Sequence, residues 1–144
     1  MKISTRGRYA LRVMIDLAEH QEEKYVSLKS IAERQKIPFK YMENIMRELT
    51  KSNLVYGVHG KGGGYHLTRE SKDYTIDEIL EVTEGGLAPV SCLECKENTC
   101  PLKDRCKTLR MWKDFYRLIK DYFSSITLSS LVGNTTIFDE CLGV

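Results

Sequence analysis

Apolar residues recur every three or four positions in three successive segments, residues 4–20, 27–36 and 38–52, as in helices that bury one face. Serine or threonine stands at the start of the first two segments, where its side chain can cap the first helical turn. Pro38 separates the second segment from the third, because the residue before a proline is disfavoured in a helix whereas proline suits a first turn. Two short helices joined by a tight turn predict a helix-turn-helix.

The pattern then changes to β-branched and aromatic residues in segments 54–59 and 65–67, on either side of a turn rich in glycine. This arrangement predicts a β-hairpin placed as a wing beside the helix-turn-helix. A flexible loop is the alternative. A nucleotide-binding loop is not favoured, since neither a GxGxxG nor a GxxxxGK[ST] sequence is present.

A fourth helix is expected over residues 75–84, where Gly85 and Gly86 end it. From about residue 107 to 132 a broad apolar face recurs at helical spacing. So wide a face needs a partner, either the body of the same subunit or a symmetry mate, and we favour a dimerisation helix. The face consists of Leu109, Trp112, Phe115, Tyr116, Ile119, Tyr122, Phe123 and Ile126.

Charge is distributed unevenly between the two halves of the chain. Residues 1–72 hold 14 Lys and Arg against 8 Asp and Glu, a net +6, and the remainder holds 8 against 12, a net −4. A module that faces phosphates, joined to one that does not, would show this asymmetry. A polarised surface without a partner is the alternative reading.

Four cysteines, Cys92, Cys95, Cys100 and Cys106, lie within fifteen residues in a C-x2-C-x4-C-x5-C arrangement. No apolar segment reaches the length of a membrane span, so we expect a cytoplasmic protein without a membrane partner. A reducing compartment disfavours disulfides, and the unpaired fifth residue Cys141 also argues against them. Clustered thiolates suit a [2Fe-2S] centre, a [4Fe-4S] centre or a structural zinc.

An enzyme is not favoured. A redox CxxC normally opens a helix after a strand, whereas Cys92 and Cys95 lie between predicted helices, and no small-molecule substrate is expected. An electron carrier would have no need of a basic helix-turn-helix and wing.

Four stretches, residues 1–12, 31–35, 41–43 and 62–65, resemble the IscR, NsrR and CymR group of winged-helix transcriptional regulators. The resemblance implies a mainly α fold with a small β-hairpin wing and a long C-terminal dimerisation helix. It also implies a homodimer that binds double-stranded promoter DNA.

The chain then divides into a winged helix-turn-helix domain over residues 1–84, a cysteine-rich sensor loop over 85–106, a dimerisation helix over 107–132 and a flexible tail over 133–144.

IscR-like members carry three cysteines that hold an iron-sulfur cluster, and Cys92, Cys100 and Cys106 match them by position. The histidine that completes the cluster in IscR is replaced by Leu109. Cys95, which the family pattern lacks, is therefore the candidate fourth ligand, although a residue of the other subunit is an alternative. The resemblance favours [2Fe-2S] over [4Fe-4S], with zinc as a further option.

Glu43 occupies the place that reads bases in IscR-like proteins, and a carboxylate there can accept from a cytosine amino group. His59 departs from an arginine common at this wing position, which would weaken attraction to the minor groove. Flanking polar residues are expected to contact phosphates or neighbouring bases. The complete predicted DNA-binding set is Lys2, Arg6, Arg8, Ser27, Lys40, Tyr41, Glu43, Asn44, Arg47, His59, Lys61 and Gly62.

These observations predict a dimeric transcriptional repressor whose promoter binding responds to an iron-sulfur cluster and hence to iron-sulfur status, nitric oxide or oxygen. The alternative is a cluster-independent winged-helix repressor of the CymR type, concerned with cysteine or sulfur metabolism. Thiol oxidation, zinc or a partner protein would regulate it.

Overall fold

The computed structural model describes residues 2–133 and is mainly helical with one antiparallel hairpin, as the sequence predicted. The helices in this part of the chain are α1 (Thr5–Glu19), α2 (Leu28–Gln35), α3 (Phe39–Lys51), α4 (Ile76–Glu84), α5 (Leu109–Ser125) and α6 (Leu128–Leu131). The strands are β1 (Val55–Val58) and β2 (Gly64–Leu67), and two 3-10 turns are η1 (Ser71–Asp73) and η2 (Ser91–Leu93). None of these helices is long and apolar enough to cross a membrane.

Side-chain caps set the starts of the first two helices as expected. The Ser4 hydroxyl accepts from the backbone N–H of Gly7, and the Ser27 hydroxyl accepts from that of Ser30 at 3.0 Å. Lys36 caps the C-terminus of α2. Its left-handed φ of 51° lets its N–H bond to carbonyls of the last helical turn. Pro38 then caps α3 without a side-chain hydrogen bond.

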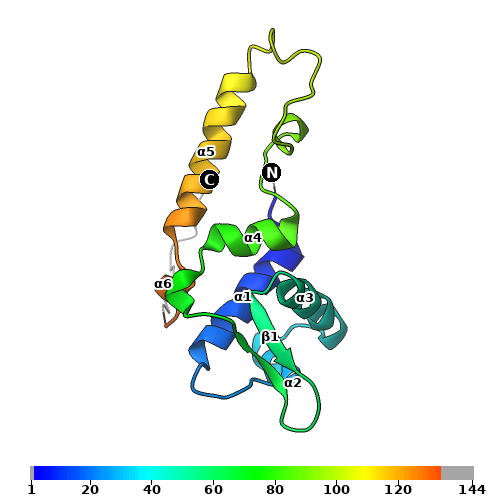
Figure 1. Cartoon of the computed structure of the whole chain (residues 1–144), viewed down its shortest axis with the longest axis vertical. Helices are drawn as coiled ribbons and strands as arrows, with labels where there is room; N and C mark the ends of the chain where they lie inside the picture. Colours follow the sequence, from blue (N-terminus) through cyan, green and yellow to red (C-terminus); the bar gives the residue numbers. More distant parts are fainter. Residues whose placement is uncertain (1, 134–144) are drawn as a thin grey trace.

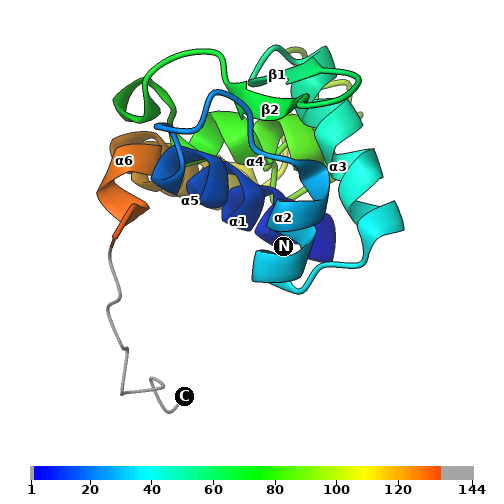
Figure 2. The same cartoon turned by 90° about the horizontal axis from the view of Figure 1, so that it is seen from below.

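The core lies between α1 and α4 on one side and α2, α3 and the hairpin on the other (Figure 2). Helix α1 can approach α4 closely because residue 7 is glycine. A Cβ at Gly7 would lie 2.1 Å from a carboxylate oxygen of Glu84, which accepts a 2.7 Å hydrogen bond from Ser4. A larger residue at position 7 would displace the Glu84 side chain and disturb its hydrogen bond with Ser4.

Tyr74 joins the base of the wing to the start of α4. Its ring is fully buried, and its hydroxyl donates to the carbonyl of Leu54 at 2.7 Å. The same oxygen accepts from the backbone N–H groups of Thr68 at 2.9 Å and Arg69 at 3.2 Å. One side chain therefore satisfies three buried or half-buried backbone groups where the hairpin ends.

The prediction of one helix over residues 107–132 was wrong in its extent. Helix α5 ends at Ser125 because Ile126 is extended and its carbonyl accepts from the N–H of Ile76 at 3.0 Å. Thr127 pairs with Thr75 in an isolated antiparallel bridge and then caps the separate helix α6. The backbone at residues 126–128 therefore forms hydrogen bonds with the segment before α4 instead of continuing helix α5.

The sequence predicted a single broad apolar face for this helix. In the structure the apolar residues of α5 are divided between a packed face and an exposed face. Ile119 is buried, and Tyr116 and Phe123 pack against the core. Four other large apolar side chains remain exposed at i, i+4, i+7 and i+11 spacing: Met111, Phe115, Leu118 and Tyr122. We call these four residues the α5 stripe.

The wing and the cysteine loop lie at opposite ends of the molecule (Figure 1). The hairpin extends at one end, whereas α5 and the segment before it extend beyond α4 at the other. The predicted tail, including Cys141, lies outside the described residues apart from Gly133.

Candidate nucleic-acid interface

Helix α3 presents a polar face opposite its buried one. Met42, Ile45, Met46 and Leu49 are buried in the core, so the intervening positions point away from it. On that outer side Lys40, Asn44 and Arg47 are exposed, and Glu43 is half-buried.

A hollow of about 690 Å³ separates α3 from the wing and gathers several predicted residues from both. Basic side chains dominate its polar lining. They come from α3 at Lys40, Arg47 and Lys51 and from the end of β1 at His59, around the one carboxylate of Glu43. The lining is completed by Leu28, Met46, Thr50, Gly57 and Tyr65.

Glu43 and Lys40 form an ion pair one turn apart, with 3.3 Å between the Lys40 ammonium and the Glu43 carboxylate. The Lys40 side chain is 85% exposed, so the pair contributes little to stability. The pair matters for the charge of this surface. Lys40 offsets the repulsion between Glu43 and a phosphate backbone, and the Glu43 carboxylate can still accept another hydrogen bond.

A second hollow, of about 320 Å³, lies on the other side of α3 and contains Arg6, Tyr41 and Asn44. Arg6 reaches it from α1 and forms a 3.2 Å ion pair with Glu48. The rings of Tyr41 and Tyr9 pack in a T-shaped arrangement, with 5.6 Å between their centroids. Arg6 and Tyr41 therefore also tie α3 to α1, a role that the sequence did not reveal.

The other predicted residues lie around this face without converging on it. Lys2 and Arg8 are exposed on the N-terminal segment, and the Ser27 hydroxyl is engaged in capping α2. Lys61 and Gly62 are exposed at the wing tip, where Gly62 has a φ of 77°. That backbone conformation favours glycine and leaves room for a close backbone approach.

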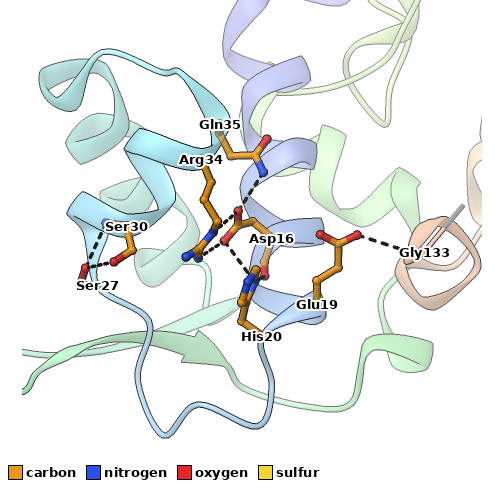
Figure 3. Close-up of polar contacts among 8 residues, drawn as sticks. All are labelled: Asp16, Glu19, His20, Ser27, Ser30, Arg34, Gln35 and Gly133. Carbon is orange, nitrogen blue, oxygen red and sulfur yellow. Dashed lines mark hydrogen bonds and ion pairs between the residues drawn. The ribbon is translucent and has the colours of Figure 1, made fainter. Parts of the chain in front are cut away.

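A buried carboxylate that the sequence reading missed holds α2 against α1. Asp16 is 1% exposed and accepts hydrogen bonds from Arg34 at 2.6 and 3.0 Å and from Gln35 at 2.8 Å (Figure 3). His20 lies beside it, and its Nδ1–H donates to the Asp16 backbone carbonyl at 2.7 Å. The signal in the sequence is an aspartate placed on the apolar side of the first helix.

This contact fixes the turn that leads into α3. Hydrogen bonding to Asp16, together with the charge of that carboxylate, outweighs burial and raises the pKa of Arg34. Arg34 and Gln35 are the last residues of α2, directly before the left-handed Lys36. Asp16 therefore sets where α3 begins relative to α1.

The four cysteines of the loop are free thiols, with Cys95 exposed and Cys92, Cys100 and Cys106 half-buried. Their chemistry fits a soft metal or an iron-sulfur cluster. Within residues 2–133, however, no three Cys, His, Asp or Glu side chains lie close enough together to hold a metal ion. The expected ligand set is thus present in one loop but is not assembled.

Cys106 differs from the other thiols by its place next to the start of α5. The Thr108 hydroxyl lies 3.5 Å from its sulfur, and donation from that hydroxyl and from nearby backbone N–H groups lowers the pKa of the Cys106 thiol. A thiol with more thiolate character is a better nucleophile and a better metal ligand.

Lys120 connects the helix after the loop to the helix before it. Its ammonium bonds to Asp77 at 2.6 Å and Glu81 at 3.0 Å, both on α4. Burial lowers the pKa of Lys120, but the two carboxylates outweigh that effect and the pKa is raised. Lys120 therefore joins α5 to α4 at a point eleven residues after α5 begins.

Comparison with known proteins gives one consistent picture. Residues 3–134 match the family model Rrf2, described as an iron-dependent transcriptional regulator. The HTH-type transcriptional regulator IscR of Pectobacterium carotovorum is 34% identical over 139 residues, 96% of this chain and 84% of that protein.

Solved structures agree. CymR, the global cysteine regulator of B. subtilis, superimposes with a TM-score of 0.72 at 35% identity, over 91% of this chain and 95% of that one. IscR of T. potens gives a TM-score of 0.68 at 38% identity, over 90% of this chain and 84% of that one.

Proposed function

The chain belongs to the Rrf2 family of iron-dependent transcriptional regulators, and from that premise we propose that it is a promoter-binding repressor governed by its cysteine loop. As an IscR-like regulator it is not an enzyme. One observation carries the proposal. The chain has a basic face between α3 and the wing, and, apart from it, a loop with four free thiols that do not yet form a metal site.

On the DNA side, α3 is proposed to enter the major groove with the wing beside it. Glu43 is the base-reading residue, accepting from a cytosine amino group, and Lys40 reduces its repulsion from phosphates. Arg47, Asn44 and Tyr41 position the helix on the backbone, together with Lys2, Arg8, Lys61 and Gly62 at the margins.

A homodimer is proposed to form through the α5 stripe. Its four side chains are 40% to 67% exposed, lie on one side of a 17-residue helix and face away from the body. Exposed apolar rows of this kind are typical of interfaces. Pairing α5 with its symmetry mate would place two α3 helices on one duplex, as a palindromic site requires.

Cys92, Cys95, Cys100 and Cys106 are the proposed ligands of an iron-sulfur cluster, and such a cluster would supply a redox-sensitive and oxygen-sensitive centre. The chain's own contribution is mechanical. Drawing the thiols together would shorten a loop whose ends lead into α4 and α5, and Lys120 joins those two helices to each other. A shift of α5 would then change how two α3 helices are spaced.

A cluster-independent regulator of the CymR kind is the second candidate. It is favoured by the dispersed thiols, by the absence of a histidine at position 109 and by the similarity to CymR. The lowered pKa of Cys106 suits a site for thiol oxidation in this case.

The test is anaerobic purification with iron, zinc and acid-labile sulfide analysis and a visible spectrum, on wild type and on the Cys95→Ala, Cys100→Ala and Cys106→Ala variants. Stoichiometric iron and sulfide, lost in the Cys100 and Cys106 variants, would support the cluster. Colourless protein without iron under strict anaerobiosis would overturn it and leave the second candidate.

A further inference from the structure

Phe39 is the first residue of α3 and is 50% exposed. A phenylalanine offers only apolar contact, so half of its surface meets water in the isolated chain without any compensating hydrogen bond. The large aliphatic residues of α3, at positions 42, 45, 46 and 49, are buried in the core, and the exposed Tyr41 packs its ring against Tyr9. Phe39 is therefore an apolar residue that lies outside the core.

The ring lies on the α2 side of α3, beside a hollow of about 390 Å³ that is lined by Lys29, Ala32, Glu33 and Ile37 as well as Phe39. Ala32 and Ile37 are buried, so the floor of the hollow is apolar. Its rim carries Lys29 and Glu33, whose side chains are 81% and 67% exposed and form an ion pair at 3.9 Å. The two rim charges offset each other, so the hollow offers mainly its apolar floor to a ligand.

Phe39 stands at the start of the helix that carries the face already described. Glu43 lies one helical turn after Phe39 and belongs to the hollow between α3 and the wing. Lys40 follows Phe39 directly and is 85% exposed on its side chain. An apolar contact and a hydrogen-bond acceptor thus stand next to each other at the end of α3 that enters a groove first.

We propose that Phe39 is a specificity residue that contacts the C5-methyl group of a thymine in the major groove of the half-site. This inference rests on the proposed DNA-binding function of α3 and deepens it. The methyl group of thymine is the one apolar group that a base edge presents in the major groove, and phenylalanine is among the side chains that contact it.

The spacing along α3 limits where that thymine lies. Four residues of helix rise about 6 Å, and neighbouring bases on one strand are separated by about 3.4 Å. The thymine read by Phe39 is therefore one or two base pairs from the cytosine read by Glu43. Tyr41, the other exposed aromatic residue of α3, lies in the hollow on the other side of the helix and packs against Tyr9, so Phe39 is the better placed of the two for the methyl group.

The test uses full-length protein and a duplex selected from a randomised library by the wild-type chain. Each thymine of one half-site is then replaced by uracil, which removes only the C5-methyl group, and dissociation constants are measured by fluorescence anisotropy. Wild type, Phe39→Ala and Phe39→Leu are compared, with thermal unfolding as the check that each variant is folded.

For wild type we expect uracil at one position to weaken binding about fourfold, the factor given by losing burial of one methyl-sized group. Phe39→Ala should bind the thymine duplex more weakly and lose the distinction between thymine and uracil, whereas Phe39→Leu should keep part of it. A uracil replacement outside the half-site should change nothing in any variant.

The inference is overturned if no thymine in the half-site is sensitive to uracil, or if Phe39→Ala discriminates as well as wild type does. If the wild-type chain selects no duplex at all, the proposed DNA-binding function fails and the Phe39 inference fails with it. The two failures are therefore distinguishable in one experiment.

Discussion

The proposed DNA-binding face on α3 and the wing differs from the cysteine loop in how its side chains are held. The side chains of the face stand on helices whose positions are held by buried contacts such as those of Asp16 and Tyr74. The loop holds chemically similar thiols on a segment with little regular structure, where the only helical piece is η2. A preformed surface can bind without rearrangement, whereas the loop requires a ligand or an oxidant to acquire a defined arrangement.

The largest effect on this difference is expected when Asp16, the hydrogen-bond acceptor that holds α2 against α1, is removed. Asp16→Ala leaves Arg34 and Gln35 without their common partner and should lower the free energy of unfolding by about 3 kcal/mol, as for other half-broken buried ion pairs. Urea denaturation measures this loss.

The matched control is Glu33→Ala, which breaks the exposed pair with Lys29 and should change stability by less than about 0.5 kcal/mol. Equal effects of the two substitutions would show that the Asp16 contacts do not order the face.

The next effect is expected at the base of the wing. Tyr74→Phe removes one hydroxyl and leaves the carbonyl of Leu54 and the N–H groups of Thr68 and Arg69 without that partner, at a cost of about 2 kcal/mol. Thermal unfolding should show a lower midpoint. Tyr56→Phe, at an aromatic residue 52% exposed on β1, serves as the control and should leave the midpoint unchanged.

A substitution of Lys120 tests the contact between α4 and α5, and its effect on stability should depend on pH. Its pKa is raised in the folded state, so its contribution is fully present below the unfolded value of about 10.4 and is lost as pH rises through the higher folded value. Lys120→Met should therefore cost about 1 kcal/mol at neutral pH.

The difference between wild type and Lys120→Met should shrink as pH rises through the higher folded-state pKa, where the folded lysine also loses its proton. Lys113→Met, at an exposed lysine of the same helix, should show no such pH-dependent difference. A gap that stays constant across this range would mean that Lys120 acts through packing rather than charge.

The smallest effect is expected in the loop itself. In metal-free protein Cys95→Ser should change the free energy of unfolding by less than about 0.5 kcal/mol, because Cys95 is exposed. The same substitution should reduce iron uptake on anaerobic reconstitution. A large loss of stability without metal would mean that the loop is already organised around Cys95.

Much of the body could be predicted from local rules. Ser4, Ser27 and Thr75 cap their helices as the sequence indicated, and glycine at position 85 ends α4. These features depend on residues within one turn of each other. The grouping of Lys40, Glu43, Arg47 and His59 also followed from the helix-turn-helix and wing.

Long-range pairing could not be predicted in the same way. The extent of α5 depends on the hydrogen bond from the N–H of Ile76 to the carbonyl of Ile126, fifty residues away. The division of its apolar residues into a packed face and an exposed stripe depends on where α4 lies. Likewise, the spacing of the cysteines indicates a ligand set but not its geometry, which the chain alone does not impose.

The most direct test of the account is the affinity of one protein preparation for one selected duplex, before and after anaerobic reconstitution with iron and sulfide. We expect the wild-type dissociation constant to change by about tenfold, a typical coupling between two sites, while Cys100→Ala binds the duplex with one unchanged affinity. An affinity that is the same before and after cluster loading in wild type would contradict the claim that the loop governs the DNA-binding face.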